Sequence, residues 1–440
     1  MAFKIDQQTI NDLRKKKKKN DVYSLYNKTS TRGGSKILKD MFLYPRSRAE
    51  EINNRVEIIK YFKEENFDFP FQNKIFDIIE EYLKNVDPRT KLNDYDYDFK
   101  RKCNISLGTD TEFNEIHKGV INTLELLINL NKFIDNLNLG KLPKKSQVSV
   151  NEVKDIMNLP EINSLLKLSI PKSLSYQNTS KYDKIFRFKV RDNLLKLLYF
   201  IYNIDVYITV AKVAITRNFS FAQIVEGQHN VIEMNQVYHP LLEKPIANDI
   251  LVGEENNMIF LTGANMAGKS TFMKTFGIAL YLAHMGFPIP AKSMRFSLQT
   301  GMYTTINLPD NLNMGYSHFY AEVNRVKTVA ENVNKSDGLI IIFDELFRGT
   351  NVKDAYEGTV AIADAFAKNR KCVFIISTHI IEAGHDLQKL KNNIKFLYLP
   401  TVMNGKIPEY TYKITEGITN DRHGMVIINN EKILDILKNK

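Results

Sequence analysis

The chain has 440 residues, of which 43% are hydrophobic and 25% are charged, and its formal net charge at pH 7 is +11. This length exceeds what one compact core usually holds, so two or three globular domains are expected. The two cysteines, Cys103 and Cys372, are far apart in the sequence, which excludes a disulfide framework and a cysteine metal site and suits a cytoplasmic protein.

The first half of the chain has a helical pattern. Residues 1–20 form a polar, basic lead-in, and the basic run at 14–19 either contacts a phosphate backbone or is a solvated charged run. Residues 21–225 have apolar residues at helical spacing, including a helix that ends at Gly140. A second helix is expected over 189–216; because charged residues interrupt it, we expect a buried helix and no membrane span.

The second half alternates short strands with helices. Strands are expected at residues 258–262, 339–343, 373–377 and 394–399. This alternation predicts a mainly parallel, doubly wound sheet that is covered on both faces. The sequence therefore predicts an all-helical part followed by an α/β part, with a boundary near residue 226.

The segment GANMAGKS fits the phosphate-loop pattern G-x-x-x-x-G-K-S/T between a predicted strand and a predicted helix. Backbone N–H groups of such a loop face an anion, and the helix N-terminus adds positive potential. Lys269 is expected to reach the β- and γ-phosphates, and Ser270 to ligate Mg²⁺. A simple strand-to-helix turn is the alternative, which the context disfavours. The predicted nucleotide-binding residues are Gly263, Ala264, Asn265, Met266, Ala267, Gly268, Lys269, Ser270 and Thr271.

Acidic and histidine side chains follow two further strands. In LIIIFDELFRGTN, Asp344 and Glu345 follow a buried strand, and ligands bind beyond the carboxyl ends of parallel strands. One of these two carboxylates is expected to hold Mg²⁺ through water, and its neighbour to polarise the attacking water. His379, in CVFIISTHIIE, follows the third strand and either senses the γ-phosphate or is a packed polar residue. We predict Glu345, His379 and Lys269 as the catalytic residues.

Four motifs together resemble those of one family. TGANMAGKST, GYSHFYAEV, FDELFRGTN and STHIIE, in this order and spacing, resemble the nucleotide-site motifs of the MutS family of DNA mismatch-repair ATPases. LYNKTSTRGGSKILKD resembles the start of that family's core domain, and the resemblance extends over about residues 21–430. It implies a multidomain fold in which an all-α core and lever domain (21–225) is followed by an α/β P-loop NTPase domain of the ABC type (226–440).

The resemblance also implies how the site works. The family's ATPase is similar to that of ABC proteins, in which two subunits share two composite sites, so a homodimer through the ATPase domains is expected. Ser317 in GYSHF corresponds to the serine that reaches the γ-phosphate bound by the other subunit, and His379 occupies the switch position. The resemblance also implies that Asp344 supports the metal with Ser270 and that Glu345 orients the attacking water. The implied cofactors are ATP and Mg²⁺.

The chain also departs from the family pattern. Ala264 and Ala267 stand where the family's loop usually has Pro and Gly, and the aromatic residue that often stacks on adenine is replaced near Pro245 and Ile246. A core that starts near residue 21 predicts a short form without the N-terminal mismatch-recognition and connector domains.

We expect a DNA-dependent ATPase that acts in DNA repair on mismatched, branched or distorted DNA. It would bind DNA without sequence specificity, and a downstream repair protein could read its nucleotide state. The main alternative is an ATP-switched adaptor or interaction protein that recognises no DNA lesion itself. An ABC transport or translation ATPase is disfavoured because NMGYSHF stands where a Leu-Ser-Gly-Gly-Gln-like signature would be. A small-molecule kinase is disfavoured because the helical half forms no evident substrate lid.

Overall fold

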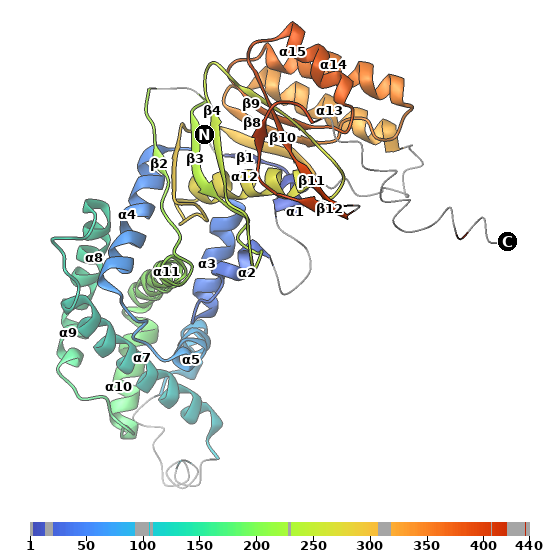
Figure 1. Cartoon of the computed structure of the whole chain (residues 1–440). Coiled ribbons are helices and arrows are strands. Elements are labelled where there is room, and N and C mark those ends of the chain that lie inside the picture. The colour runs from blue at the N-terminus through green and yellow to red at the C-terminus, as the bar shows by residue number, and fades with distance from the viewer. Residues whose placement is uncertain are drawn as a thin grey trace. The chain divides into compact units, whose positions relative to one another are not determined.

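The computed structural model describes residues 3–13, 21–92, 105, 109–227, 230–306, 318–405, 407–419 and 436 (Figure 1). It consists of two compact units whose segments alternate along the chain. An α/β unit contains Met1–Tyr26, Phe42–Val56 and Val213–Lys440, and a helical unit contains Asn27–Met41 and Glu57–Lys212. Three helices continue from one unit into the other: α3 (Arg32–Leu43), α4 (Ala49–Glu65) and α11 (Arg191–Thr216).

The α/β unit is built around one large sheet. Among the described residues, seven strands follow the order β1-β7-β8-β9-β5-β10-β13, and every neighbouring pair is parallel except β10 and β13. The strands are β1 (Lys4–Ile5), β7 (Gly301–Thr305), β8 (Leu339–Asp344), β9 (Val373–Ser377), β5 (Met258–Gly263), β10 (Ile394–Leu399) and β13 (Thr415–Glu416).

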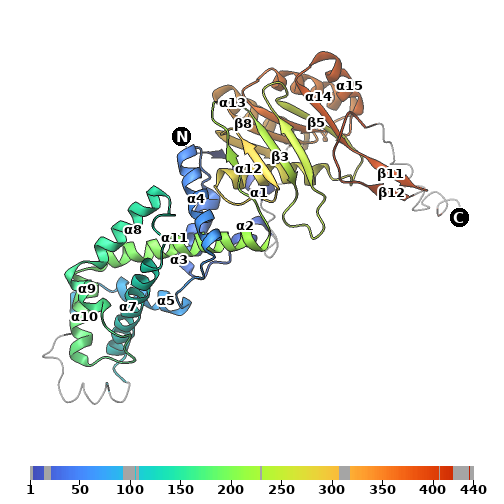
Figure 2. The ribbon, with the colours of Figure 1, turned by 60° about the vertical axis from the view of Figure 1, so that its left-hand side comes forward.

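Helices cover both faces of this sheet (Figures 1 and 2). α1 (Gln7–Leu13) and α12 (Lys269–His284) pack on one face, and α13 (His318–Lys335), α14 (Val352–Ala367) and α15 (Ile381–Leu390) pack on the other. Because both faces are covered, every residue of β5, β8 and β9 is buried, as expected for central parallel strands. The predicted strands in this region are confirmed.

A second, smaller sheet lies in the same unit. Its order is β2-β6-β3-β4, and β3 pairs antiparallel with both of its neighbours. Its strands are β2 (Gln223–Ile224), β6 (Ser293–Phe296), β3 (Ile232–Val237) and β4 (Asn248–Val252). A separate hairpin joins β11 (Thr401–Asn404) to β12 (Ile407–Tyr410), and α2 (Val22–Tyr26) completes the unit.

The helical unit packs around α7 (Thr111–Asp135), whose N-terminus is capped by the Asp110 carboxylate through the Phe113 N–H at 2.9 Å. Its other elements are α5 (Asn73–Lys84), the 3₁₀ turn η1 (Pro88–Thr90), α8 (Lys144–Met157), α9 (Pro160–Leu166) and α10 (Tyr176–Phe188). α7 ends at Asp135, before the predicted end at Gly140.

The prediction that an all-α core and lever domain is followed by an α/β ATPase domain is wrong in its arrangement. The α/β unit takes three separate stretches of chain, and β1 pairs with β7 at the edge of the large sheet. The mainly antiparallel second sheet was also not expected. Sequence periodicity could not predict this arrangement, because β1 has only two residues and its partner strand is almost 300 residues away.

The long apolar helix α11 matches the helix predicted at 189–216. Among the described residues it alone is long and apolar enough to cross a membrane, but 67% of its most apolar window is buried within the protein. This burial is that of a core helix.

A buried ion pair organises one end of the helical unit. The Arg187 guanidinium and the Asp183 carboxylate are both fully buried, with Nε and Oδ1 2.5 Å apart. Arg187 also donates to the Thr90 carbonyl at 3.0 Å, and the Tyr82 hydroxyl donates to Asp183 at 2.8 Å. The pair therefore fixes the turn after α5 against α10.

Replacing Arg187 with Met should destabilise the helical unit by about 3–5 kcal/mol, because Asp183 would be left as a buried charge without its cation. Urea unfolding followed by circular dichroism measures the change. Arg89→Met is the matched control: Arg89 pairs with Asp87 at the surface, so its loss should leave the unfolding midpoint unchanged. Equal midpoints for the two variants would contradict the assigned role of Arg187.

Candidate nucleotide site

The large sheet brings the predicted phosphate loop, Asp344 and His379 to one edge. Leu261 of β5 and Asp344 of β8 both pair with Ser377 of β9. The carboxyl ends of these three strands therefore lie side by side, where open α/β sheets bind ligands.

The phosphate loop connects β5 to α12. Gly268 precedes α12 with φ +104°, and a Cβ there would lie 3.0 Å from the Tyr412 ring, so this position requires glycine. The Lys269 Nζ donates to the carbonyls of Gly263 at 2.9 Å and Ala264 at 3.3 Å, which curls the loop around the ammonium group. Burial lowers the pKa of Lys269, although the carboxylates of Glu345 and Asp344 act in the opposite direction.

The alanines of the loop are tolerated. Ala267 is buried and does not have a positive φ; the left-handed position falls on the exposed Met266, at φ +67°. The backbone reaches its curled shape without glycine at 267, because the strain is carried one residue earlier.

Asp344, the last residue of β8, accepts hydrogen bonds from two hydroxyl groups. Ser270 donates to its Oδ2, and Ser377 donates to its Oδ1 at 2.6 Å. A hydroxyl and a carboxylate oxygen are ligands that suit Mg²⁺, which usually completes its octahedron with water and substrate phosphate oxygens. Ser270 and Asp344 therefore fit the predicted Mg²⁺ site.

Glu345 lies in the centre of a charged cluster. Its carboxylate contacts the His379 Nε2 at 2.6 Å and the Arg348 Nε at 2.5 Å, and His379 Nε2 lies 3.2 Å from the Lys269 Nζ. Burial raises the pKa of Glu345, but the hydrogen bond from His379 and the charges of Arg348 and Lys269 outweigh it, so the net pKa is lowered. Glu345 is thus held as a carboxylate.

Two residues after β8 have positive φ values. Glu345 has φ +60° and Phe347 has φ +63°, a conformation that is uncommon for residues with side chains. The buried Phe347 ring lies against Phe319 of α13, with ring centroids 5.8 Å apart, and against Gly358 of α14. This packing holds the turn that aims Glu345 towards His379.

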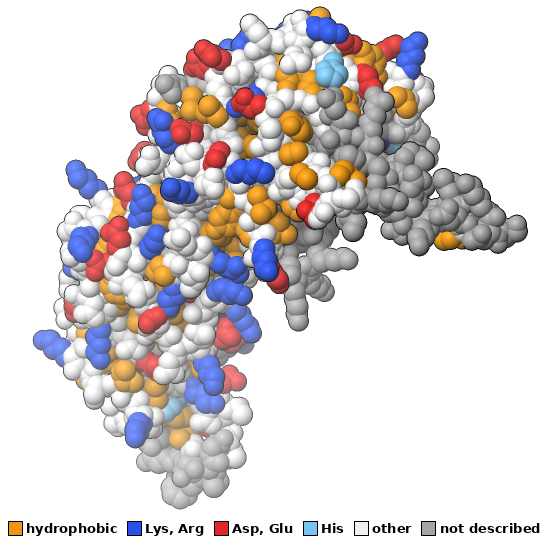
Figure 3. All heavy atoms as spheres, in the orientation of Figure 1, with side chains coloured by type: hydrophobic (Ala, Val, Ile, Leu, Met, Phe, Trp, Pro, Cys, Tyr) orange, Lys and Arg blue, Asp and Glu red, His pale blue; other side chains and the backbone are white. Residues whose placement is uncertain are grey.

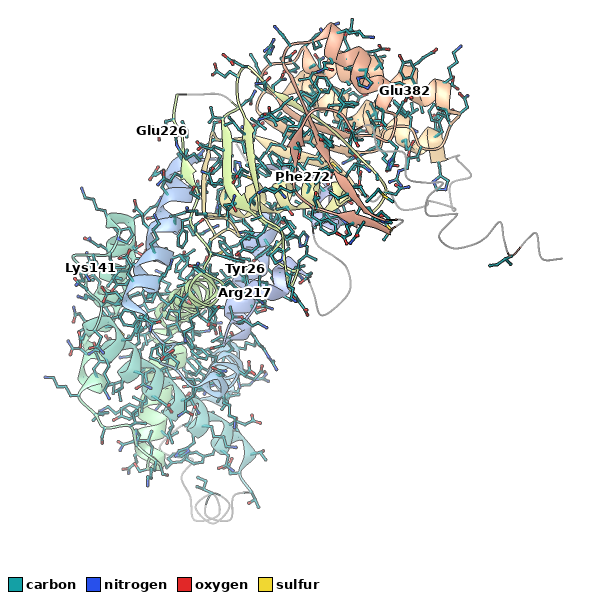
Figure 4. The ribbon with its side chains drawn as sticks, in the orientation of Figure 1. Tyr26, Lys141, Arg217, Glu226, Phe272 and Glu382 are labelled. Carbon is teal, nitrogen blue, oxygen red and sulfur yellow. The ribbon has the colours of Figure 1, made fainter. Side chains whose placement is uncertain are left out.

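A cavity of about 680 Å³ opens over the phosphate loop. Phe272 of α12, labelled in Figure 4, lies in its wall, and so do His239, Tyr412 and Arg348. None of these four residues was predicted from the sequence. Pro245 and Ile246, where an adenine-stacking aromatic residue was missing from the sequence pattern, also line this cavity, and Tyr412 brings a ring to it from a distant segment.

A neighbouring cavity of about 710 Å³ shares Ser270, Glu345 and Arg348 with the first. It is also lined by the Asp344 carboxylate and by residues of β7 and α13 that include Arg325. Ser317, predicted to act across the dimer, falls within 307–317 and lies outside the described residues, and so does the basic run at 14–19.

Residues 259–436 match the family model of MutS domain V. Domain V is the ATPase domain of that family. The phosphate loop, Asp344, Glu345 and His379 all lie in the matched segment. The chain is also 30% identical over 275 residues to the DNA mismatch repair protein MutS of Clostridium tetani. This match covers 60% of the chain and 30% of the relative.

Two further relatives have a similar extent. The DNA mismatch repair protein MutS of Petrotoga mobilis is 29% identical over 295 residues, 64% of this chain and 35% of the relative. MutS protein homolog 4 of Homo sapiens is 29% identical over 205 residues, 44% of this chain and 22% of the relative. The matches therefore span about a third or less of these relatives, and they support the resemblance to the MutS family that the motifs indicate.

The lowered pKa of Glu345 has a consequence for stability. A carboxylate whose pKa is lower in the folded protein stabilises the fold above its unfolded pKa, and this contribution is lost as pH falls through the folded value. Glu345→Gln should therefore reduce the free energy of unfolding at about pH 7 relative to wild type, and the difference should shrink below about pH 4.3.

Urea unfolding of both proteins across this pH range measures the effect. Glu357→Gln, an exposed change on α14, is the control and should behave as wild type at each pH. A Glu345→Gln difference that grows towards acid pH would contradict the assigned electrostatics.

Proposed function

We propose that this chain is a MutS-like ATPase that acts on DNA in repair, and that it hydrolyses ATP with Mg²⁺ at the site described above. One observation carries the proposal: Lys269, Asp344, Glu345 and His379 converge at the carboxyl edge of the large sheet, within the segment that matches MutS domain V. Each of these side chains has the chemistry that one part of nucleotide hydrolysis needs.

The phosphate loop binds the triphosphate in this proposal. Backbone N–H groups at the start of α12 face the phosphates, and Lys269 exchanges its bonds to the Gly263 and Ala264 carbonyls for phosphate oxygens. Ser270 and Asp344 would hold the Mg²⁺, which would supply positive charge to offset that of the phosphates. Tyr412 and the apolar wall of Pro245 and Ile246 contact the base.

Glu345 orients the attacking water by accepting a hydrogen bond from it. It is suited to this role because it remains ionised, and Arg348 and His379 fix the direction of its two oxygens. His379 lies between Glu345 and Lys269, so its contacts change when a phosphate binds Lys269. These contacts support a role for His379 as the sensor of the γ-phosphate.

A second copy of the chain completes the site in this proposal. Ser317 of that copy would reach the γ-phosphate, so ATP binding and pairing of the ATPase units would depend on each other. The DNA would be held mainly through its phosphates, and a downstream repair protein could read the closed state. In the helical unit, Lys and Arg side chains are dispersed among Asp and Glu over the face shown in Figure 3, which is consistent with backbone contacts that do not read sequence.

The test is ATP turnover by wild type and Lys269→Ala, measured without DNA and with homoduplex, mismatched and four-way DNA over a salt series. We expect DNA to raise wild-type turnover, the increase to fall steeply with salt, and the variant to lose turnover, because Lys269 contacts the phosphates.

Lys274→Ala is the matched control, since it changes a lysine of the same helix that does not line the nucleotide cavity. Lys269-dependent turnover that is equal with every DNA and without DNA would favour the ATP-switched adaptor instead. Turnover that persists in Lys269→Ala would contradict the site.

A further inference from the structure

The N-terminal segment of the α/β unit holds one wall of the cavity beside Asp344 and Glu345. We call residues 3–13 the N-terminal strap; they contain β1 and α1. β1 lies beside β7, and α1 lies beside α12 (Figure 2). β1 pairs with β7 in register Lys4↔Gly301, so it covers what would otherwise be an open edge of the large sheet. Phe3 and Leu13 are buried at the two ends of the strap.

Asp12 binds the end of β7. Its buried Oδ2 accepts hydrogen bonds from the Thr304 hydroxyl at 2.7 Å and from the Ile306 N–H at 2.9 Å. The Thr9 hydroxyl accepts the Thr304 N–H at 2.8 Å. These three hydrogen bonds therefore fix residues 304–306, two of which, Thr305 and Ile306, line the cavity.

Asp6 binds α13, which lines another part of the same cavity. One of its oxygens accepts from the Arg325 guanidinium of α13, and the other caps α1 through the Thr9 N–H at 2.9 Å. Arg325 in turn donates to the Thr305 hydroxyl at 3.0 Å and the Thr304 carbonyl at 2.8 Å. The strap thus ties the end of β7 to α13, and Arg325 also lines the cavity.

We propose that the N-terminal strap sets the positions of the end of β7 and of α13 relative to Asp344 and Glu345, and that Asp12 is a positioning residue for ATP turnover. The proposal rests on the ATPase activity proposed above. β7 ends just before the segment that contains Ser317, and α13 begins just after it. The strap therefore contacts the elements on both sides of that segment.

The test compares wild type with Asp12→Ala, Asp12→Asn and Gln7→Ala. Gln7 is exposed on α1, and its side chain donates to Asn11 of the same helix, so Gln7→Ala is the matched control. Asp12→Asn keeps the shape and one acceptor oxygen, so it should retain part of the function and guards against a failure of Asp12→Ala to fold.

Three quantities are measured: kcat for ATP with DNA, the dissociation constant of ATP by calorimetry, and hydrogen exchange of the Ile306 amide. Asp12→Ala should lower kcat by roughly tenfold to a hundredfold through misplacement of the cavity wall, while ATP affinity changes by less than about twofold. The Ile306 amide should exchange faster, Asp12→Asn should be intermediate, and Gln7→Ala should match wild type.

A kcat for Asp12→Ala close to that of Gln7→Ala would overturn the proposal. A loss of ATP affinity as large as the loss of kcat would also overturn it, because Asp12 would then be merely structural. Wild-type protein without Lys269-dependent turnover would overturn the proposed function instead, whereas normal wild-type turnover with an unaffected Asp12→Ala would overturn only the role of the strap.

Discussion

The parallel pairing of β5, β8 and β9 places three polar strand ends within reach of one another. Each of these strands is buried on both faces, so a shift in register would expose apolar residues to water or bury polar ones. The register that the core requires therefore also places the phosphate loop, Asp344 and His379 around one point. Packing of apolar side chains sets the geometry of the polar site.

The polar groups at this point satisfy one another within the protein. Lys269 is bound by the carbonyls of its own loop, Asp344 accepts from two serine hydroxyls, and Glu345 lies between Arg348 and His379. A ligand must replace these hydrogen bonds with its own rather than pair with unsatisfied polar groups. Its net binding energy is therefore smaller than a count of its contacts implies. Such an arrangement can have two stable sets of contacts, which is what a nucleotide-dependent switch requires.

Local patterns in the sequence predicted much of this site. β5, β8, β9 and β10 are short apolar runs with clear ends, and the phosphate loop has a spacing that few other segments share. Long-range features could not be predicted in this way. β1 has two residues and no periodicity, and Tyr412 reaches the phosphate loop only through the folding of the segment after β10. Asp12 lies in a polar stretch of sequence, and its partners at residues 304–306 are nearly 300 residues away.

The edge position of β1 bears on how the chain acquires its structure. About 300 residues separate β1 from β7, and the whole helical unit is synthesised between them. During synthesis, β1 and α1 therefore cannot pack against β7 until it has been made, and Phe3 and Leu13 remain exposed until then. Closure of the sheet edge is thus a late event in biogenesis, and a chaperone that shields the nascent N-terminal segment would favour correct pairing over aggregation.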